Sequence, residues 1–524
     1  MEKMLGVMLD CSRNAVMKVD AVKDYALILK KMGYNTLMLY TEDTYEVDNQ
    51  PYFGHLRGRY SKEEMKELDT YCNGIGIELV PCIQTLAHLE NIFKWYTEYE
   101  DIRDCDDILL VGEDKTYALI EDMLSSLRQC YTTKKIHIGM DEAGNVGKGK
   151  YMNKHGLEDR FDIINNHLHK VCELCKKYDF EPMIWSDMFC NLALNIENQY
   201  EEVDASKILE KAALPENISL VYWDYYSTDV NRYKRQIKTN KMFGKPTYFA
   251  GGAWTWWGFA PHNQYSIDTT KAAITACNEC GIDGVFFTVW GDFGGECTKY
   301  AVLPSLMYAA ELVKGNEDME SIKSKFREIV GADFDAFMLL DKLDEPGGNH
   351  RENPSRYLIF NDVFMGVCDS MCDIKDDIYY EKLAKDIKNV DAGEYSVIFD
   401  SYQKLAELLS IKASLGIRTR EAYLAGDKAT LKLLVKDYEL AIEKLEAFHS
   451  VYQKLWFWEN KPHGFDVQDI RLGGTIKRIS SCKKRLEEFV SGDVATIPEL
   501  NEPVLEKINA TCCSFMRTAT VNNI

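Results

Sequence analysis

Two adjacent carboxylates, Asp141 and Glu142, stand where an apolar run over residues 135–140 ends and a glycine-rich loop begins. A strand that stops on such a pair presents two acids in different surroundings, and the surroundings rather than the residue type set each pKa. The pair can therefore divide the acid and base work of a catalysed reaction. The alternative is a helix cap or a solvated turn, which is the commoner role of an isolated Asp-Glu dipeptide.

The elements that must position this pair are short runs of apolar, β-favouring residues along the first part of the chain. They alternate with amphipathic stretches of helical length, one of which opens with a capping box from Ser61 to Glu64. This alternation predicts a parallel sheet covered by helices, and eight such units in about 310 residues fit a (β/α)8 TIM barrel. The alternative, an open doubly wound sheet, lacks a glycine-rich phosphate turn after its first strand. The predicted strands are Leu5–Leu9, Thr36–Tyr40, Ile77–Ile83, Ile136–Met140, Pro182–Trp185, Ser219–Trp223, Thr247–Ala250 and Gly284–Trp290.

Nearly every predicted strand ends in polar or aromatic residues. In a barrel of this kind the carboxyl ends of all strands converge on one face, where active sites are built. One tryptophan alone is more often part of a core, but tryptophan at the end of four different strands is hard to explain by core packing. We therefore predict that these side chains line one bowl. They include Arg13, His88, Asp141, Glu142, Trp185, Trp223, Trp254, Trp290 and Asp292.

The pattern changes in the second part of the chain. With 524 residues the chain is longer than one core usually serves. From about residue 315 onward, long helical periodicities rich in Lys, Glu and Leu replace the strand signals. We therefore predict a catalytic barrel over residues 1–315 and an α-helical C-terminal domain over residues 316–524. An aromatic segment, residues 456–462, follows the longest predicted helix. It could be a domain interface, a dimer contact or a loop reaching toward the bowl, and burial in an interface is the prediction.

Charge and composition exclude several classes of partner. The formal net charge of −21 argues against nucleic acid and anionic membranes. No run of roughly eighteen apolar residues predicts a membrane span, and the first residues lack the pattern of a signal peptide. The sixteen cysteines are therefore expected to be reduced, in a cytoplasmic protein. Cys277 and Cys280 have redox-motif spacing, but they lie in a predicted helix without a second pair. Neither a metal nor another cofactor is predicted.

The residue types of the bowl indicate a carbohydrate site. Aromatic faces suit the apolar faces of sugar rings, while carboxylates and arginine bind hydroxyls through directional hydrogen bonds. Glycosidases normally place two carboxylates on opposite sides of the scissile bond, about 5 Å or more apart. Sequence neighbours at a strand end can hardly do so. The adjacent pair fits better with a nucleophile supplied by the substrate, in which one acid protonates the leaving oxygen and the other polarises a 2-acetamido group.

At this point the sequence resembles a known family. The segment 137–142, His-Ile-Gly-Met-Asp-Glu, is similar to the signature His-x-Gly-Gly-Asp-Glu of the family 20 glycoside hydrolases, the β-N-acetylhexosaminidases. Met140 replaces the second glycine. Further motifs follow in the order of the family: a first-strand segment ending in Arg13, a third-strand segment ending in His88, and Trp-Gly-Asp over residues 290–292 where the family usually has Trp-Gly-Glu. The resemblance covers the predicted barrel.

The resemblance implies a retaining exo-β-N-acetylhexosaminidase that removes terminal β-linked N-acetylglucosamine, or N-acetylgalactosamine, through an oxazolinium intermediate. It implies that Glu142 is the general acid/base. Asp141 would stay ionised, orient the acetamido group and stabilise the developing charge. Arg13 would hold O3 and O4 of the sugar. Asp292 would contact O4 or O6, although it is shorter than the glutamate of the family.

One family residue has no match in its usual place. The family holds the acetamido oxygen with a tyrosine just after the seventh-strand tryptophan, but here Thr255 follows Trp254. Tyr225, just beyond Trp223, is the candidate for this role. A barrel followed by a helical domain resembles the shorter bacterial exo-β-N-acetylglucosaminidases, which implies a homodimer. The substrate-binding residues that the resemblance implies are Arg13, His88, His137, Trp185, Trp223, Trp254, Trp290 and Asp292.

Several alternatives stay open. His88 and His137 are implied to support the acids through hydrogen bonds, but a satisfied core histidine is an equal interpretation of His137. A non-catalytic amino-sugar-binding barrel is the second hypothesis, and the presence of both acids speaks against it. A third hypothesis takes His137, Asp141 and His155 as metal ligands of a hydrolase, although the remaining ligands are not evident.

Overall fold

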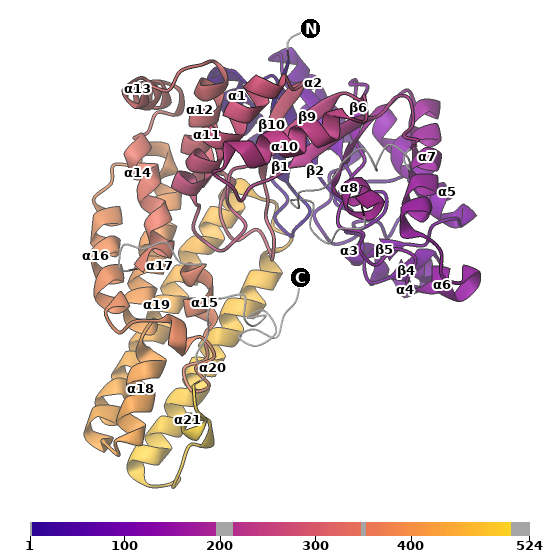
Figure 1. Ribbon diagram of the computed structural model, residues 1–524. Coiled ribbons are helices and arrows are strands. Elements are labelled where there is room, and N and C mark those ends of the chain that lie inside the picture. The colour runs from indigo at the N-terminus through magenta and orange to yellow at the C-terminus, as the bar shows by residue number, and fades with distance from the viewer. Residues whose placement is uncertain (1–2, 195–212, 347–352, 505–524) are drawn as a thin grey trace.

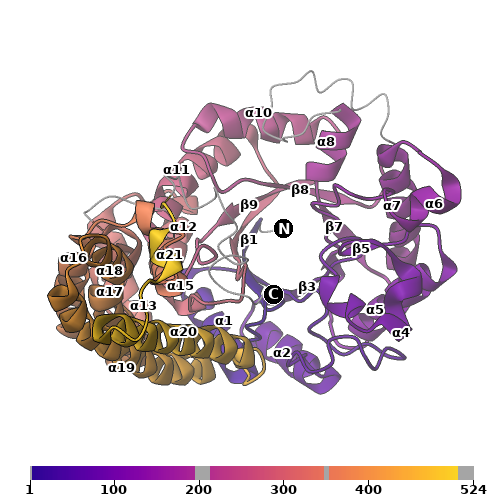
Figure 2. The same cartoon turned by 90° about the horizontal axis from the view of Figure 1, so that it is seen from below.

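The computed structural model describes residues 3–194, 213–346 and 353–504. Its first part is a closed barrel in which eight parallel strands have the spatial order β1-β10-β9-β8-β7-β6-β3-β2 (Figure 1). The prediction of a TIM barrel is therefore confirmed. Figure 2 shows the ring of strands from below. The strands are β1 (Met4–Asp10), β2 (Thr36–Tyr40), β3 (Glu78–Cys82), β6 (Lys135–His137), β7 (Glu181–Trp185), β8 (Ser219–Trp223), β9 (Thr247–Gly252) and β10 (Gly284–Val289).

A helix follows every barrel strand and packs outside the ring. The predicted capping box at Ser61 is present, because its side chain accepts from Glu64 N while the Glu64 carboxylate accepts from Ser61 N. The segment between β3 and its helix also carries α3 (Glu90–Phe93), α4 (Tyr96–Tyr99) and a small antiparallel pair, β4 (Arg103–Cys105) and β5 (Ile108–Leu109). The covering helices are α1 (Val19–Met32), α2 (Lys62–Gly74), α5 (Asp114–Arg128), α7 (Arg160–Lys177), α8 (Asp187–Leu194), α10 (Val230–Lys241), α11 (Asn263–Cys280) and α12 (Leu303–Val313).

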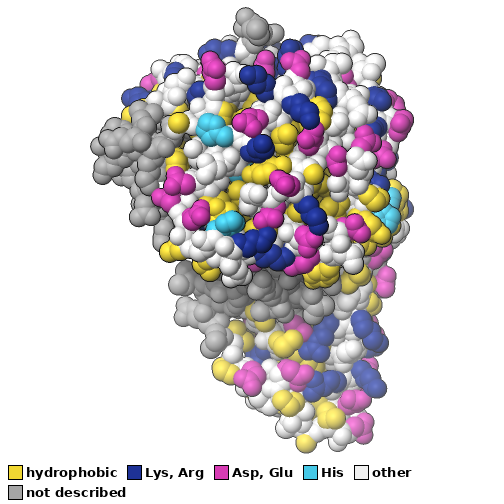
Figure 3. Space-filling model, turned by 90° about the vertical axis from the view of Figure 1, so that its right-hand side faces the viewer, with side chains coloured by type: hydrophobic (Ala, Val, Ile, Leu, Met, Phe, Trp, Pro, Cys, Tyr) yellow, Lys and Arg dark blue, Asp and Glu magenta, His cyan; other side chains and the backbone are white. Residues whose placement is uncertain are grey.

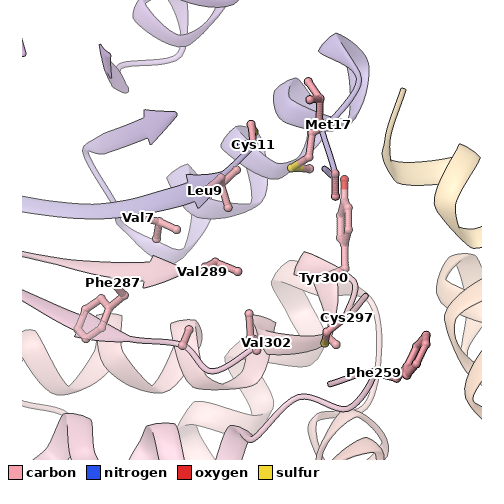
Figure 4. Packing of buried hydrophobic residues seen from close by; sticks show 14 of the residues in the cluster. Val7, Leu9, Cys11, Met17, Phe259, Phe287, Val289, Cys297, Tyr300 and Val302 are labelled. Atoms are coloured by element: carbon pink, nitrogen blue, oxygen red, sulfur yellow. The ribbon is translucent and has the colours of Figure 1, made fainter. Parts of the chain in front are cut away.

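Side chains alternate between the inside of the barrel and the layer between strands and helices. Met8 belongs to the interior cluster, whereas its neighbours Val7 and Leu9 pack outward. Figure 4 shows this outer layer, where Val7 and Leu9 lie near Val289 of the adjacent strand. Both faces of each strand are thus buried, which explains why the strands read as nearly continuous apolar runs.

The second part of the described chain is helical and lies to one side of the barrel (Figure 1). The long helix α19 runs through most of the aromatic segment and ends at Glu459, so the predicted break comes a few residues later than expected. The helices are α13 (Met319–Val330), α14 (Phe334–Met338), α15 (Pro354–Phe360), α16 (Asp376–Lys388), α17 (Ser396–Lys412), α18 (Leu415–Leu424), α19 (Lys428–Glu459), α20 (Phe465–Ser491) and α21 (Pro498–Asn501).

The aromatic segment 456–462 packs against the barrel. Its backbone pairs with the chain after β1, because Lys18 N donates to Glu459 O (3.0 Å) and Lys461 N donates to Val16 O (2.7 Å). The Glu459 carboxylate is buried and faces the equally buried Lys299, whose ammonium lies 3.7 Å away. Trp456, Glu459 and Asn460 are buried in this contact within the chain, whereas Phe457 is exposed, so the predicted burial holds for part of the segment.

Three further features are the state of the cysteines, the apolar character of the helices and the charge of the surface. Within the described ranges all cysteines are free, and Cys277 and Cys280 lie on α11 without a disulfide. In the same ranges no helix combines the length and the apolar character that crossing a bilayer requires. On the face seen in Figure 3, acidic and basic side chains are interspersed rather than gathered by sign.

Candidate active site

A cavity of about 260 Å³ lies at the carboxyl ends of the barrel strands. Every strand contributes to its wall, either at its end or from the loop that follows. All of the predicted site residues except His137 and Trp254 line this cavity, while Tyr40, Tyr226, Trp256 and Phe293 line it without having been predicted. The lining residues are Arg13, Tyr40, His88, Asp141, Glu142, Trp185, Trp223, Tyr225, Tyr226, Trp256, Trp290, Asp292 and Phe293.

The turn that carries the two acids is unusual in its backbone. Strand β6 ends at His137, three residues before the predicted end, and the chain then adopts positive φ at Gly139 (73°), Met140 (73°) and Glu142 (52°). A Cβ at Gly139 would lie 2.1 Å from Gln84 Oε1. Met140 adopts a conformation that favours glycine. This explains why the family usually has glycine at this position of the signature. The Met140 side chain is buried.

Asp141 is fixed by two neighbours. Gln84 Nε2 donates to Asp141 Oδ1 (2.7 Å), and Gln84 Oε1 in turn accepts from Met140 N (3.1 Å). His88 Nε2 lies 3.3 Å from the other oxygen, Oδ2. Burial alone would raise the pKa of Asp141, but the neighbouring His88 and the hydrogen bonds from His88 and Gln84 hold the pKa below its ordinary value. Asp141 is therefore suited to stay ionised.

Glu142 lies in different surroundings. Its Oε2 is 3.6 Å from the same His88 nitrogen, and its side chain is 60% exposed toward the cavity. Desolvation inside the cavity and, next, the negative charge of Asp141 raise the pKa of Glu142 above its ordinary value. The environments thus push the pKa values of the two acids apart, which is the arrangement of a proton donor beside a permanent anion.

A buried carboxyl behind the wall supports Glu142. Asp187 Oδ2 accepts from Glu142 N (3.2 Å), and its Oδ1 accepts from Trp223 Nε1 (3.3 Å). Asp187 thereby ties the positive-φ residue of the turn to an aromatic wall of the cavity. Burial and, next, the charge of Asp141 raise the pKa of Asp187 to about 7. Asp187 stands two residues after the end of β7, and it was not predicted as a site residue.

A chain of polar contacts connects the acids to Arg13. Arg13 Nη2 lies 3.2 Å from His88 Nδ1, and Arg13 Nε lies 3.2 Å from Glu42 Oε1. Tyr40 donates its hydroxyl hydrogen to the same Glu42 oxygen (3.0 Å). Burial raises the pKa of Glu42 to about 7, against the effect of Arg13. Glu42 and Tyr40 thus orient Arg13, and neither was predicted as a site residue, although Glu42 follows the end of β2.

Aromatic side chains form the rest of the wall. Trp223 and Tyr225 stack with ring centroids 5.4 Å apart, and Trp290 Nε1 donates to the Tyr225 hydroxyl (3.2 Å). Tyr225 is only 5% exposed, whereas Tyr226 is 46% exposed. Both line the cavity, so the structure brings two tyrosines, rather than one, within reach of a bound molecule.

Trp254 lies behind this wall, so its predicted place in the binding surface has to be corrected. It is fully buried, stacks on Trp256 at 4.2 Å, and donates from Nε1 to Tyr225 O (3.2 Å). Trp256 reaches the cavity instead. A Cβ on Gly252 would approach the Trp256 ring to 2.7 Å, so the glycine at the end of β9 leaves the space that this ring fills.

His137 does not reach the cavity either. It is fully buried, its ring lies 4.3 Å from that of Trp185, and its Nδ1 accepts from Gly139 N (3.1 Å). Burial lowers its pKa to about 3, so the imidazole is neutral. His137 thus has the features of the core histidine that was the alternative interpretation, and it contacts the turn through the Gly139 backbone.

The proposed metal-ligand set is not assembled. Among the described residues, the group of histidine and carboxylate ligand atoms that meet within 4.8 Å is His88, Asp141 and Glu142. His155 lies exposed on the short helix α6 (Lys150–His155), and His137 is enclosed in the barrel. The set of His137, Asp141 and His155 therefore has to be abandoned.

Comparisons with known proteins show which family models and chains this protein is similar to. The family model described as "Glycosyl hydrolase family 20, catalytic domain" matches residues 5–313, and that of the "Glycoside Hydrolase 20C C-terminal domain" matches residues 335–512. Hexosaminidase D of Homo sapiens is 24% identical over 351 residues, which are 61% of this chain and 67% of that protein. Hexosaminidase D of Bos taurus is 22% identical over 350 residues, which are 61% of this chain and 94% of that protein. The solved structure of a beta-N-acetylhexosaminidase from Bacteroides fragilis has a TM-score of 0.48 at 18% identity, covering 63% of this chain and 70% of that one.

Proposed function

The chain belongs to glycosyl hydrolase family 20, and on that premise we propose that it is a retaining exo-β-N-acetylhexosaminidase. Its substrate would be an oligosaccharide or glycoconjugate that ends in β-linked N-acetylglucosamine or N-acetylgalactosamine. The nucleophile would be the 2-acetamido group of the substrate itself.

One observation carries the proposal: both acids approach the same nitrogen atom. His88 Nε2 lies 3.3 Å from Asp141 and 3.6 Å from Glu142, so the two carboxylates occupy one side of the cavity. A glycosidase with a protein nucleophile places its two carboxyl groups on opposite faces of the sugar, about 5–5.5 Å apart. Two acids on one side suit the other division of work, in which the acetamido oxygen attacks and the neighbouring carboxylate guides it.

The different surroundings of Asp141 and Glu142 assign each acid its step in the proposed reaction. Glu142, whose raised pKa favours the protonated form, gives its proton to the glycosidic oxygen as the bond to the anomeric carbon breaks. The acetamido oxygen forms a bond to that carbon, and the ionised Asp141 accepts a hydrogen bond from the acetamido N–H and stabilises the positive charge of the oxazolinium ion. Glu142, now a carboxylate, takes a proton from water, whose oxygen attacks the anomeric carbon and reopens the ring. Two displacements at the same carbon retain its configuration.

The size and the wall of the cavity support an exo mode of action. Its volume of about 260 Å³ lies near the lower end of small-molecule sites, about 300–1,000 Å³. Trp185, Trp223, Trp256 and Trp290 surround it with aromatic faces on which the apolar faces of one sugar ring can pack. Asp292 and Arg13 also line the cavity and can bind the hydroxyl groups of the terminal sugar.

The test is hydrolysis of the 4-nitrophenyl β-glycosides of N-acetylglucosamine and N-acetylgalactosamine, with proton NMR of the first-formed anomer. We expect the β-anomer and tight inhibition by a thiazoline that mimics the cyclised acetamido group. Formation of the α-anomer, or hydrolysis that the thiazoline leaves unchanged, would contradict the mechanism. Binding of N-acetylglucosamine without hydrolysis of any glycoside tested would favour the non-catalytic barrel instead.

A further inference from the structure

The loop after β10 is where the helical region reaches the active site. This loop, residues 291–296, carries the cavity residues Asp292 and Phe293. On the barrel side, Gly291 N donates to Asp10 Oδ2 (2.9 Å). Further contacts of the loop come from α15, α19 and α20, and α15 and α20 lie beside the ring of strands on the side of β1 and β9 (Figure 2). The position of Asp292 is therefore determined from two parts of the chain.

A buried ionic cluster joins the loop to the helices. The Glu296 side chain, which is completely buried, accepts from Arg356 Nε at Oε2 (2.5 Å) and from Arg471 Nη1 at Oε1 (3.0 Å). Arg356 comes from α15 and Arg471 from α20, so one carboxylate bridges two helices. Charge-assisted hydrogen bonds of this kind are short and directional, and removing one partner of a buried pair leaves an uncompensated charge.

The same helices also hold the backbone of the loop. Arg471 Nη1 donates to Phe293 O (2.6 Å), Gln468 Nε2 donates to Gly294 O (3.2 Å), and the Tyr452 hydroxyl donates to Glu296 O (3.1 Å). Three carbonyl groups of one short loop are thus bound by side chains of α19 and α20. A loop held at so many points has little freedom to shift.

The conformation of Phe293 shows why the loop needs this support. Phe293 has a φ of 62°, in the left-handed region that a residue with a bulky side chain rarely adopts. Its ring is 50% exposed at the cavity, so core packing of this side chain does not fix it. The Arg356 guanidinium lies 5.2 Å from the ring centroid and Arg471 binds the carbonyl, and these contacts keep the strained residue in place.

One arginine of the cluster also acts on the charge of Asp292. The guanidinium groups of Arg356 and Arg471 both face the Glu296 carboxylate beside the loop. Burial raises the pKa of Asp292, while the positive charges of Arg13, His88 and Arg356 oppose this shift and favour the ionised carboxylate. An ionised Asp292 can accept hydrogen bonds from two sugar hydroxyls, which a protonated one does less well.

We propose that Arg471 and Arg356 of the helical region are positioning residues that, through Glu296 and the carbonyls of the β10 loop, place Asp292 against the O4 and O6 hydroxyls of the terminal sugar. The helical region is thereby a determinant of sugar specificity rather than an independent module. This inference rests on the proposed hexosaminidase activity, and it assigns the discrimination between O4 epimers to contacts outside the barrel.

The experiment is a double-mutant cycle with Arg471→Lys and Asp292→Ala in the full chain. It compares kcat/KM for the 4-nitrophenyl glycosides of N-acetylglucosamine and N-acetylgalactosamine, with thermal unfolding of each variant. Arg471→Lys keeps the charge but removes the guanidinium Nη1, which donates to both Glu296 Oε1 and Phe293 O, and replaces it with an ammonium of different reach and geometry. The matched control is Arg478→Lys, on the same face of α20 two turns later, where the guanidinium pairs with Asp362 (2.5 Å) and does not touch the loop.

We expect Arg471→Lys to lower kcat/KM for the preferred sugar by about 10- to 100-fold, as for a misplacement of about 1 Å. The ratio between the two sugars should fall toward that of Asp292→Ala, and the double variant should be no worse than Asp292→Ala alone. Arg478→Lys should keep the wild-type ratio. Additive losses, or an unchanged ratio in Arg471→Lys, would overturn the proposal.

A milder variant covers the case in which Arg471→Lys does not fold. Tyr452→Phe removes only the hydroxyl that donates to Glu296 O. We expect the same direction of change in the sugar ratio at about threefold, and an unchanged ratio in a folded protein would again contradict the proposal. Wild-type protein that cleaves neither glycoside would refute the proposed function itself, so the two failures are distinguishable.

Discussion

Gln84 donates a hydrogen bond of 2.7 Å from its side-chain nitrogen to Asp141 Oδ1. Its side-chain oxygen accepts from Met140 N (3.1 Å), so one amide group holds both the backbone and the carboxylate of the strained turn. Only an amide can fill both roles, because an ionised carboxylate accepts but does not donate. Gln84 is fully buried, and its orientation is therefore fixed by these two partners and by the Tyr40 hydroxyl.

The first prediction concerns this contact. In Gln84→Glu a second carboxyl replaces the donor to Asp141, and like charges at this distance raise the pKa of Asp141. We expect the acidic limb of the kcat/KM profile to move to higher pH by about one pH unit, with lower activity near pH 5. The control is Gln403→Glu, where a glutamine donates to Glu407 on α17 away from the cavity. An unmoved acidic limb in Gln84→Glu would mean that Asp141 does not set it.

The contrast between these contacts and the barrel shows how far the sequence could lead. The barrel could be predicted because both faces of each strand are buried, which leaves a recognisable apolar run such as Thr36–Tyr40. The acids could be predicted because they stand in the loop that follows β6, at the face where all strands end. Both features depend on residues that are close in sequence, and the regular backbone of a strand relates such residues in a fixed pattern.

The parts that could not be predicted lie where regular backbone ends. After Gly252 the chain leaves β9, so strand alternation no longer says that Trp256 rather than Trp254 faces the cavity. Methionine rarely adopts a positive φ, so the residue type at position 140 does not indicate the backbone conformation found there. The partners of Glu296 are 60 and 175 residues away in sequence, and pairings of that range arise only from packing of the complete fold.

The second prediction is the pH dependence of the unmodified enzyme. In the proposed mechanism activity requires Asp141 ionised, and its lowered pKa places the loss of activity on acidification below the ordinary range of an aspartate. It also requires Glu142 protonated, and its raised pKa means that activity falls only as the pH rises above the ordinary value for a glutamate. We expect a bell-shaped kcat/KM profile with its maximum at mildly acidic pH, whose two limbs belong to the coupled pair. A profile that keeps rising through neutral pH would contradict these roles.

The third prediction separates proton donation from binding. Glu142→Gln cannot protonate the leaving oxygen, so the loss depends on how much the leaving group needs a proton. We expect kcat/KM to fall about 10²- to 10⁴-fold for an alkyl or sugar aglycone, and clearly less for a dinitrophenyl one. The alkaline limb should also disappear. Equal losses for both kinds of leaving group would show that Glu142 acts in another way.

The fourth prediction concerns the anion. Asp141→Asn keeps the size of the side chain but removes the negative charge that faces the developing oxazolinium ion. We expect a loss of about 10²- to 10³-fold in kcat for every leaving group, together with weaker binding of the thiazoline. The measurement is a set of glycosides with graded leaving groups. A loss confined to poor leaving groups would assign Asp141 to proton transfer instead.

The last prediction decides which tyrosine holds the acetamido oxygen. The Tyr225 hydroxyl oxygen accepts a hydrogen bond from Trp290 Nε1 (3.2 Å), which fixes the hydroxyl group. Because the indole nitrogen can only donate, the hydroxyl hydrogen of Tyr225 is left to donate to another group. Tyr226 is more exposed and less constrained. A fixed donor stabilises a transition state better than a mobile one, because it needs no reorganisation. We expect Tyr225→Phe to lower kcat at least tenfold more than Tyr226→Phe, with unfolding temperatures that agree within a few degrees. Substrates with an N-trifluoroacetyl group, whose oxygen is a poorer acceptor, should reduce the difference between the two variants. A larger loss in Tyr226→Phe would transfer the role to Tyr226 and leave Tyr225 as a support for Trp290.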